Sequence, residues 1–324
     1  MSKLLDLAIA NLSSPLILCF VLGAFAALVR SDLYVPEAAA KALSIYLLFA
    51  IGFKGGVSVS DHGLDATLLS ALLVGVALSA ALPFLAFGLL RVMSRLDRVN
   101  AAAVAGHYGS ISIVTFVAAT SVLQDNGLSS EGFMVAVAAA MEAPAILSAL
   151  WLISRDGSAR MDSKLWREIL LNGSIVLLLG SFLIGALTGK DGLAEIESFI
   201  VSPFKGVLCL FLLDMGLIAG RGIRDNRAMI GPGLLAFGVL MPILGGFAGA
   251  LAGAILGLST GGTMLFAVLG ASASYIAVPA AMRVAVPDAD PGIYLTLSLG
   301  ITFPFNLTIG IPLYLAVARM ITGA

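Results

Sequence analysis

The sequence predicts an all-α membrane protein that crosses the bilayer ten times, as two inverted repeats of five helices. Composition is the first observation: 60% of the 324 residues are hydrophobic, 11% are charged and the mean hydropathy is +1.06. Soluble domains contain about 45–50% apolar and about 25% charged residues. Membrane β-barrels show short alternating segments, whereas the apolar runs here are long, so the class is helical. The formal net charge of −1 gives no reason to expect a nucleic-acid partner.

Ten apolar runs are long enough to cross a hydrocarbon core of about 30 Å, which takes about 20 residues per helix. Pro83 and Pro242 lie inside the third and eighth runs and could kink those helices. The longest polar segment, 154–170, divides the chain into repeats at 1–153 and 171–324, with 154–170 as the linker. The expected spans are residues 13–30, 37–53, 66–92, 99–123, 128–153, 171–189, 201–220, 229–256, 261–286 and 292–321.

The distribution of basic residues is the second observation, and it predicts the orientation. Thirteen of the 18 Lys and Arg residues fall on the side of the membrane that carries the loop 154–170, and five fall on the other side. Cytoplasmic loops carry the excess of Lys and Arg. We therefore expect 154–170 to be cytoplasmic and both termini to face outward.

An internal repeat is the third observation. A shift of 164 residues places two separate glycine-containing motifs on two others. Because each half has an odd number of spans, the second half enters the membrane the other way up. Inverted repeats with broken helices in matching positions are typical of transporters. The matched pairs are Gly52 with Gly216, Gly56 with Gly220, Gly106 with Gly270, Ser110 with Ser274 and Val114 with Val278.

The matched motifs predict that the fourth and ninth spans break at mid-membrane and cross. Residues 106–118 place a histidine, a tyrosine, two serines and two glycines at the centre of an apolar span. We expect the second half-helices to begin near Gly109–Ser110 and near Ala273–Ser274. Helix N-termini carry partial positive charge and free N–H groups, so two of them make an anion site without a buried cation. The expected donors are the backbone amides and the hydroxyls of Ser110, Ser112, Ser272 and Ser274; the alternative is that these serines only allow close helix packing.

Oxygen-bearing residues in other spans predict a sodium site beside the anion. Glu142 lies midway along the fifth span, two residues before Pro144, which frees a carbonyl. An ionisable residue at membrane depth is costly and indicates function by default. Carbonyls at the ends of the first half-helices can also coordinate a cation. The expected sodium ligands are Gly106, Glu142, Gly270, Thr302 and Asn306.

Two further ionisable residues and both cysteines have plainer interpretations. Asp214 lies within the seventh span and either serves the transported ion or pairs with a neighbouring helix. His107 is more simply a hydrogen-bonded structural residue, because no cysteine or carboxylate shares its face at the spacing of metal ligands. Cys19 and Cys209 lie in apolar runs and are expected to be inert thiols.

The sequence lacks the motifs of nucleotide-driven pumps and hydrolases. There is no GxxxxGK[ST], GxSxG or HExxH pattern. We therefore expect no enzyme activity and no cofactor, and transport driven by an ion gradient with Na⁺ as the coupling ion.

At GHYGSISIVTFVAA (106–119) the sequence resembles the sodium-dependent bicarbonate transporter family of the cyanobacterial SbtA type. The stretches GFKGG (52–56), MEAP (141–144), LDMGLIAG (213–220), GASASYIAVPAAMR (270–283) and FPFN (303–306) agree with it. The resemblance covers nearly the whole chain. It implies a homotrimeric symporter for bicarbonate and sodium in the bacterial inner membrane. By motif match, binding roles fall on Gly109, Ser110, Ser112, Ala273, Ser274 and Tyr275.

The family also implies a PII-like regulatory protein on the cytoplasmic face. The linker 154–170 is shorter than is common in the family, which argues against that partner here. Three alternatives to bicarbonate symport stay open: sodium-coupled symport of another small anion, a sodium/proton antiporter, and a membrane sensor that does not transport. An antiporter usually has adjacent acids at the helix crossing, where this sequence has serines.

Overall fold

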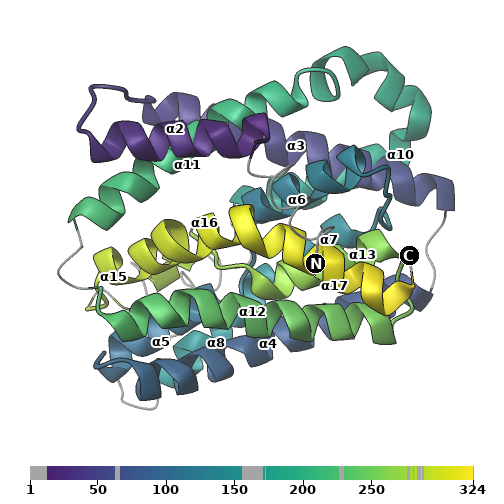
Figure 1. Cartoon of the computed structure of the whole chain (residues 1–324). Helices are drawn as coiled ribbons and strands as arrows, with labels where there is room; N and C mark the ends of the chain where they lie inside the picture. The colour runs from purple at the N-terminus through teal and green to yellow at the C-terminus, as the bar shows by residue number, and fades with distance from the viewer. Residues whose placement is uncertain are drawn as a thin grey trace.

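The computed structural model describes residues 13–62, 66–154, 171, 173–225, 230–275, 278–279, 281–282, 286 and 288–323, and within these ranges it is helical without strands (Figure 1). Seven helices are long and apolar enough to span a membrane, and three shorter apolar helices accompany them. Each of the ten expected spans overlaps helical residues, but 99–123 is divided between two helices and 261–286 overlaps one of the three shorter helices only over its first part. The expected linker lies almost wholly outside the described residues.

The first half of the chain contains α2 (Pro15–Leu28), α3 (Glu37–His62), α4 (Ala66–Met93), α5 (Arg98–His107), α6 (Ile113–Asp125), α7 (Met134–Ala140) and α8 (Glu142–Ser154). The second half contains α10 (Gly173–Ile200), α11 (Phe204–Asp225), α12 (Pro232–Ile255), α13 (Thr260–Ala271) and α15 (Pro291–Leu295), followed by the π-helical turns η1 (Thr296–Thr302) and η2 (Asn306–Gly310) on either side of α16 (Phe303–Phe305), and by α17 (Ile311–Thr322).

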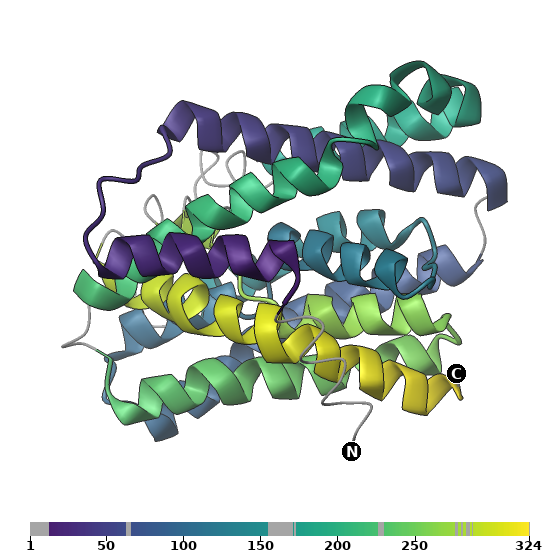
Figure 2. The ribbon, with the colours of Figure 1, turned by 45° about the horizontal axis from the view of Figure 1, so that its top comes forward.

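The helices form two layers, which Figures 1 and 2 show from different angles. The four-helix layer consists of α2, α3, α10 and α11, in which α3 packs on α10 and α2 packs on α11. The broken-helix layer contains the remaining helices, among which α12 packs on α13 and α4 packs on α5 and α8. The two layers meet where α11 contacts η1 and where α3 and α10 contact α7.

Matched glycines set the helix pairs of the four-helix layer. A Cβ atom at Gly52 or Gly56 of α3 would strike the carbonyls of Leu178 and Phe182, one turn apart on α10. A Cβ at Gly216 or Gly220 of α11 would likewise strike the carbonyls of Phe20 and Ala24, one turn apart on α2. Backbones can approach this closely only where the side chain is absent. The 164-residue offset seen in the sequence therefore corresponds to the same packing contact in both halves.

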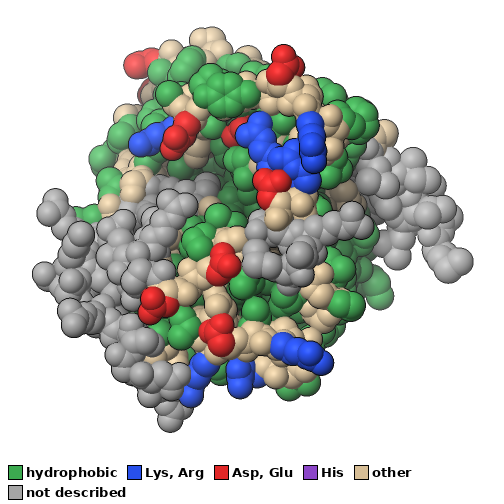
Figure 3. Space-filling model, turned by 90° about the vertical axis from the view of Figure 1, so that its left-hand side faces the viewer, with side chains coloured by type: hydrophobic (Ala, Val, Ile, Leu, Met, Phe, Trp, Pro, Cys, Tyr) green, Lys and Arg blue, Asp and Glu red, His purple; other side chains and the backbone are tan. Residues whose placement is uncertain are grey.

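The described basic residues separate onto two ends of the molecule. At the first end, Arg224 donates to the Ala27 carbonyl and Arg221 donates to the Leu33 carbonyl. At the other end, Lys205 pairs with Asp125, and Arg319 donates to the Asn126 side chain. Figure 3 faces the first end, where several Lys and Arg side chains gather, and we call it the arginine-rich end.

Candidate functional site

The fourth expected span is broken, as the sequence predicts. Helix α5 ends at His107, and α6 begins at Ile113, so residues 108–112 are not helical. The second half-helix was expected near Gly109–Ser110 and begins slightly later, because Ser112 adopts an extended backbone and caps α6. Its side chain accepts hydrogen bonds from the Thr115 N–H at 3.2 Å and from the Thr115 hydroxyl at 2.8 Å.

The break brings α5 close to α4, and this contact explains the glycine. A Cβ atom at Gly109 would overlap the Ser79 carbonyl and the Pro83 ring of α4. Ser110 follows, fully buried, and among the described residues its hydroxyl has no hydrogen-bond partner. Close approach by α4 therefore requires glycine at 109, while an unsatisfied hydroxyl remains at 110.

The ninth expected span is interrupted at the matching position. Helix α13 ends at Ala271, and residues 272–275 are not helical, so the second half-helix does not begin at Ala273–Ser274 as expected; most of residues 276–287 lie outside the described part of the chain. The Ser272 hydroxyl donates back to the Val268 carbonyl at 2.6 Å, so its proton completes the last turn of α13 and is not available to donate to an anion. Ala273 and Ser274 are both buried. At Gly270, a Cβ would meet the Gly245 carbonyl, so α13 and α12 also touch backbone to backbone.

The two breaks are bonded to each other. The Ser274 N–H donates to the His107 carbonyl at 2.8 Å, and His107 Nδ1 lies 2.5 Å from the Ser274 carbonyl. The His107 ring also stacks on Tyr294, with 4.7 Å between ring centroids. His107 is therefore hydrogen-bonded through Nδ1, as its structural interpretation predicts. At Gly106, a Cβ would meet Ala149, so α5 and α8 are closely packed beside this junction.

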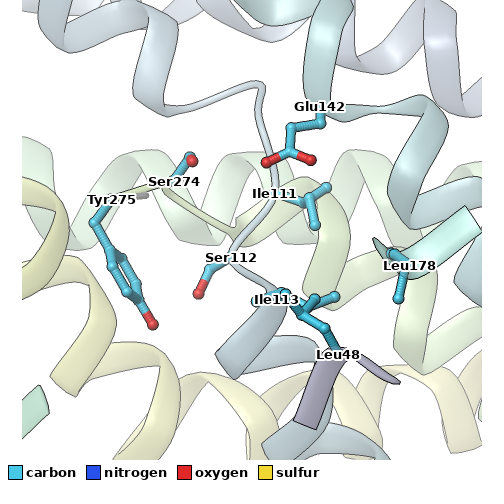
Figure 4. Close-up of a pocket in the computed structure, with 8 residues that line it drawn as sticks. All are labelled: Leu48, Ile111, Ser112, Ile113, Glu142, Leu178, Ser274 and Tyr275. Atoms are coloured by element: carbon cyan, nitrogen blue, oxygen red, sulfur yellow. The ribbon is translucent and has the colours of Figure 1, made fainter. Parts of the chain in front are cut away.

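A small cavity lies where the two breaks approach the four-helix layer. Its volume is about 10 Å³, which is close to the minimum needed for one water molecule. Figure 4 shows the Glu142 carboxylate directed toward the irregular stretch between α5 and α6. The lining consists of Ser112, Ser274, Tyr275 and Glu142, together with Ile111 and Ile113 beside the first break and Leu48 and Leu178 from the four-helix layer.

Glu142 reaches this cavity because the fifth expected span is itself interrupted. Helix α7 ends at Ala140, and α8 begins at Glu142. Pro144 has no N–H to donate to the carbonyl four residues earlier, and the Ser79 hydroxyl bonds the Met141 carbonyl at 2.5 Å. The Glu142 carboxylate, 5% exposed, thus occupies the N-terminus of α8, where the helix dipole favours a negative charge.

Tyr275 adds a phenol to the cavity wall. Its ring packs edge-on against Phe303, with 5.4 Å between centroids. The hydroxyl is buried and lies beside the Ser112 side chain, with no hydrogen bond of normal geometry between them. A buried polar group without a partner is costly, so a ligand that bonds this hydroxyl would recover free energy.

Thr302 and Asn306 make structural hydrogen bonds outside the cavity. The Thr302 hydroxyl donates to the Gly238 carbonyl at 2.7 Å and accepts from Tyr108 at 2.7 Å. The Asn306 amide donates to the Ala271 carbonyl at 2.8 Å, and its oxygen accepts from Tyr314 at 3.2 Å. The two side chains connect the tenth span to the ends of the broken helices.

Asp214 lies apart from the other candidates. It is buried in α11, within the four-helix layer, and it does not line the cavity. Among the described residues, no three His, Cys, Asp or Glu side chains are close enough to hold a metal ion together. A cation in this cavity would therefore rely on Glu142 together with neutral oxygens, which suits Na⁺ better than a transition metal.

The cavity thus combines hydroxyls and one carboxylate with the start of α6, where Ser112 caps the Thr115 N–H. Groups of these kinds bind small oxyanions and monovalent cations, and the cavity would have to widen to hold them, because its present volume is that of one water molecule. Comparison with known proteins gives one family: a family model described as the Na⁺-dependent bicarbonate transporter superfamily matches residues 15–319. No curated protein matches the chain.

Proposed function

The chain belongs to the Na⁺-dependent bicarbonate transporter superfamily, and we propose that it is a symporter that imports bicarbonate with sodium by alternating access. The family consists of transporters and not of enzymes, and the apolar helices make the chain a multi-pass membrane protein. The proposal depends mainly on one observation: residues of both helix breaks, Glu142, and Leu48 and Leu178 of the four-helix layer line the same cavity.

In the proposed site, the anion binds between the two breaks. The N–H groups of Ile113 and Val114, which begin α6, have no partner within the helix, whereas the Thr115 N–H donates to Ser112. The hydroxyls of Ser112, Ser274 and Tyr275 line the same space, and Ser110 offers a further buried hydroxyl. The missing side chain of Gly109 makes room for α4, so the proposed contributions of Gly109 and Ala273 to the ligand come from their backbone N–H groups. A bicarbonate ion presents oxygens that accept from these donors and one hydroxyl that can donate.

The proposed sodium ion binds Glu142 and neutralises it when the anion arrives. A lone carboxylate in the membrane interior is costly, and pairing it with Na⁺ lowers the cost of adding an anion. The carbonyls of Gly106 and Gly270, in the last turns of the first half-helices, are the proposed additional contacts. Thr302 and Asn306 are proposed as positioning residues, because their present hydrogen bonds hold the broken helices together.

The two layers are the proposed moving bodies. The cavity lies at their boundary, since six of its lining residues come from the broken-helix layer and two from the four-helix layer. The matched contacts of Gly52 with α10 and of Gly216 with α2 support two inverted repeats, 1–153 and 171–324. A shift of one layer against the other would open the cavity to each end in turn.

The arginine-rich end is the proposed cytoplasmic end, following the excess of basic residues. Both termini would then face outward from a bacterial inner membrane. A homotrimer, and a PII-like partner at the cytoplasmic end, remain proposals that rest on the resemblance.

The function is tested by uptake of labelled bicarbonate into proteoliposomes that contain the purified chain. An inward Na⁺ gradient should drive uptake, and equimolar K⁺ or choline should reduce it to the level of empty liposomes. Uptake that is indifferent to this replacement would overturn the sodium coupling. Binding of bicarbonate without any flux would instead identify a sensor.

A second candidate is sodium-coupled symport of another small anion on the same scaffold. The donors around the cavity are neutral hydroxyls and amides, which do not by themselves distinguish one oxyanion from another. Competition of labelled bicarbonate uptake by unlabelled nitrate, formate and acetate separates the two. A sodium/proton antiporter is disfavoured because Glu142 is the one carboxylate among the residues that line the cavity.

A further inference from the structure

A second and larger cavity lies between the layers, toward the end opposite the arginine-rich end. Its volume is about 260 Å³, and it is bounded by α3, α6, α7 and the start of α11. Gln124 and Ser129 at its margin are exposed, so the cavity communicates with the surface. We call it the vestibule.

Lys54 is the cation of the vestibule. It belongs to α3, where the rise of 1.5 Å per residue places it about 12 Å from the end of the helix. Among the described residues, no carboxylate lies within salt-bridge distance of the Lys54 ammonium. Lys54 Nζ lies instead 4.1 Å from the centre of the Phe204 ring. A half-buried lysine held by an aromatic ring keeps its charge available to a ligand.

The acidic groups near the vestibule are already engaged. Glu131 lines the cavity, but its carboxylate accepts hydrogen bonds from the Ser259 N–H at 2.7 Å and from the Ser259 hydroxyl at 3.1 Å, at the N-terminus of α13. That helix end offsets part of the Glu131 charge. Asp125, at the end of α6, is paired with Lys205. Lys54 is therefore the one basic side chain among the residues that line the vestibule, and the Glu131 carboxylate is held against the start of α13.

The vestibule continues toward the central cavity along two helix faces. On α3, Leu48 lines the central cavity, and Ile51 and Lys54 line the vestibule at successive intervals of three residues. On α6, Ile113 lines the central cavity, and Phe116 lines the vestibule one turn later. Ile51 and Phe116 thus occupy the stretch between the two spaces, and a modest shift between the layers would connect them.

An equivalent cavity exists at the arginine-rich end. Its volume is about 300 Å³, and it is lined by α11 and by residues 291–300, including Arg221. The 164-residue shift carries the vestibule segment 128–135 onto 292–299 and carries Lys54 onto Ile218, one turn before Arg221. Each end of the layer boundary therefore has a cavity with one basic side chain from the equivalent helix.

We propose that the vestibule is a second anion-binding site, in which Lys54 captures a small oxyanion before it reaches the two helix breaks. The site rests on the proposed function for its physiological ligand, bicarbonate, but its charge selectivity does not depend on transport. A cation in a cleft with low-dielectric walls raises the local concentration of anions and their rate of arrival.

The test measures the charge selectivity of the vestibule with thiol reagents. Cys19 and Cys209 are replaced by alanine, and Thr120→Cys, on the vestibule wall, serves as the reporter. The purified chain is labelled with an anionic and with a cationic methanethiosulfonate of similar size. We expect the anionic reagent to react faster, Lys54→Gln to lower the anionic-to-cationic rate ratio on the order of tenfold, and Lys54→Arg to preserve it.

Arg319→Gln is the matched control, since it removes an equal charge at the same end of the molecule, where Arg319 donates to the neutral Asn126 side chain and does not line the vestibule. Its rate ratio should equal that of the reporter protein. An unchanged ratio in Lys54→Gln, or an equal loss in Arg319→Gln, would overturn the site.

Protection by bicarbonate gives a second measurement that needs no Lys54 variant. Bicarbonate in the bath should slow labelling of Thr120→Cys in a concentration-dependent manner, and the absence of protection by bicarbonate, nitrate and formate alike would overturn the proposal. A protein that shows the charge selectivity and protection but no sodium-driven bicarbonate uptake would contradict the proposed function and leave the vestibular site standing. A protein with normal sodium-driven bicarbonate uptake but no charge selectivity at Thr120→Cys would contradict the vestibular site and leave the proposed function standing.

Discussion

His107 and Ser274 hold each other across the two helix breaks, although 167 residues separate them in the chain. The Ser274 N–H donates to the His107 carbonyl, and the Ser274 carbonyl accepts at His107 Nδ1. A carbonyl can only accept, so Nδ1 carries the hydrogen, and Nε2 has no partner among the described residues. The pair fixes the relative position of the two breaks on which the proposed site depends.

Removal of the imidazole should therefore loosen the junction. His107→Ala leaves the buried Ser274 carbonyl without its partner, and the loss should destabilise the protein by about 1–3 kcal/mol. His107→Asn retains a donor on a shorter side chain and should recover part of the loss. Thermal unfolding in detergent at constant pH measures both variants. An unfolding temperature in His107→Ala equal to that of the unmodified chain would show that the reciprocal pair contributes nothing.

The two serines of the first break should respond differently to alanine. Ser112 caps α6, so Ser112→Ala should lower stability by about 1 kcal/mol and also raise the KM for bicarbonate. The Ser110 hydroxyl has no partner to lose, so Ser110→Ala should raise the KM several-fold while leaving the unfolding temperature unchanged. Uptake kinetics and thermal unfolding together distinguish the two.

Ser121 is the control for Ser110, because it is also buried and unpartnered among the described residues but lies further along α6, away from the cavity. Ser121→Ala should change neither quantity. If Ser110→Ala behaves in the same way as Ser121→Ala, Ser110 takes no part in anion binding.

Glu142 should determine the sodium dependence of uptake. Glu142→Gln keeps the size of the side chain but removes its charge, so the Na⁺ concentration for half-maximal uptake should rise on the order of tenfold or more. Asp214→Asn removes a charge from the four-helix layer, outside the cavity, and should leave that concentration unchanged. Uptake rates measured across a Na⁺ series test both. A normal sodium dependence in Glu142→Gln would exclude it as a ligand.

Much of this arrangement could be predicted from residue types. Glycine and serine in the middle of apolar runs indicate helix breaks, because such residues neither fill a lipid-facing surface nor favour a continuous helix. Both breaks are present, between His107 and Ile113 and after Ala271. Helix α6 begins at Ile113 and not near Gly109–Ser110, because the sequence alone does not show whether Ser110 or Ser112 caps the helix.

The tertiary partners of the tenth span could not be predicted in this way. Thr302 and Asn306 were expected as sodium ligands because of their oxygens, yet their hydrogen bonds go to Gly238 and Ala271 on other helices. The π-helical turns η1 and η2 were also not expected. Pro304 and Pro312 remove backbone donors from this span, which is a signal for irregular helix, but the signal does not specify a π-turn.

The matched glycines of the four-helix layer give the sharpest test of the repeat. Gly216→Ala places a methyl group against the Phe20 carbonyl of α2, and Gly52→Ala places one against the Leu178 carbonyl and the Ser181 hydroxyl of α10. The hydroxyl can rotate away, but the backbone carbonyls cannot. Overpacking of this kind costs about 1–3 kcal/mol. We therefore expect both variants to unfold at lower temperature by similar amounts, since equivalent helix pairs are forced apart.

Gly180→Ala is the control within α10, because its methyl group would meet no atom within 4 Å, and it should be neutral or stabilising by about 0.5–1 kcal/mol. Thermal unfolding of the three variants in one detergent decides the matter: a large loss at Gly52 with none at Gly216 would mean that the two helix pairs are not equivalent, and the support they give to the inverted repeat would be withdrawn.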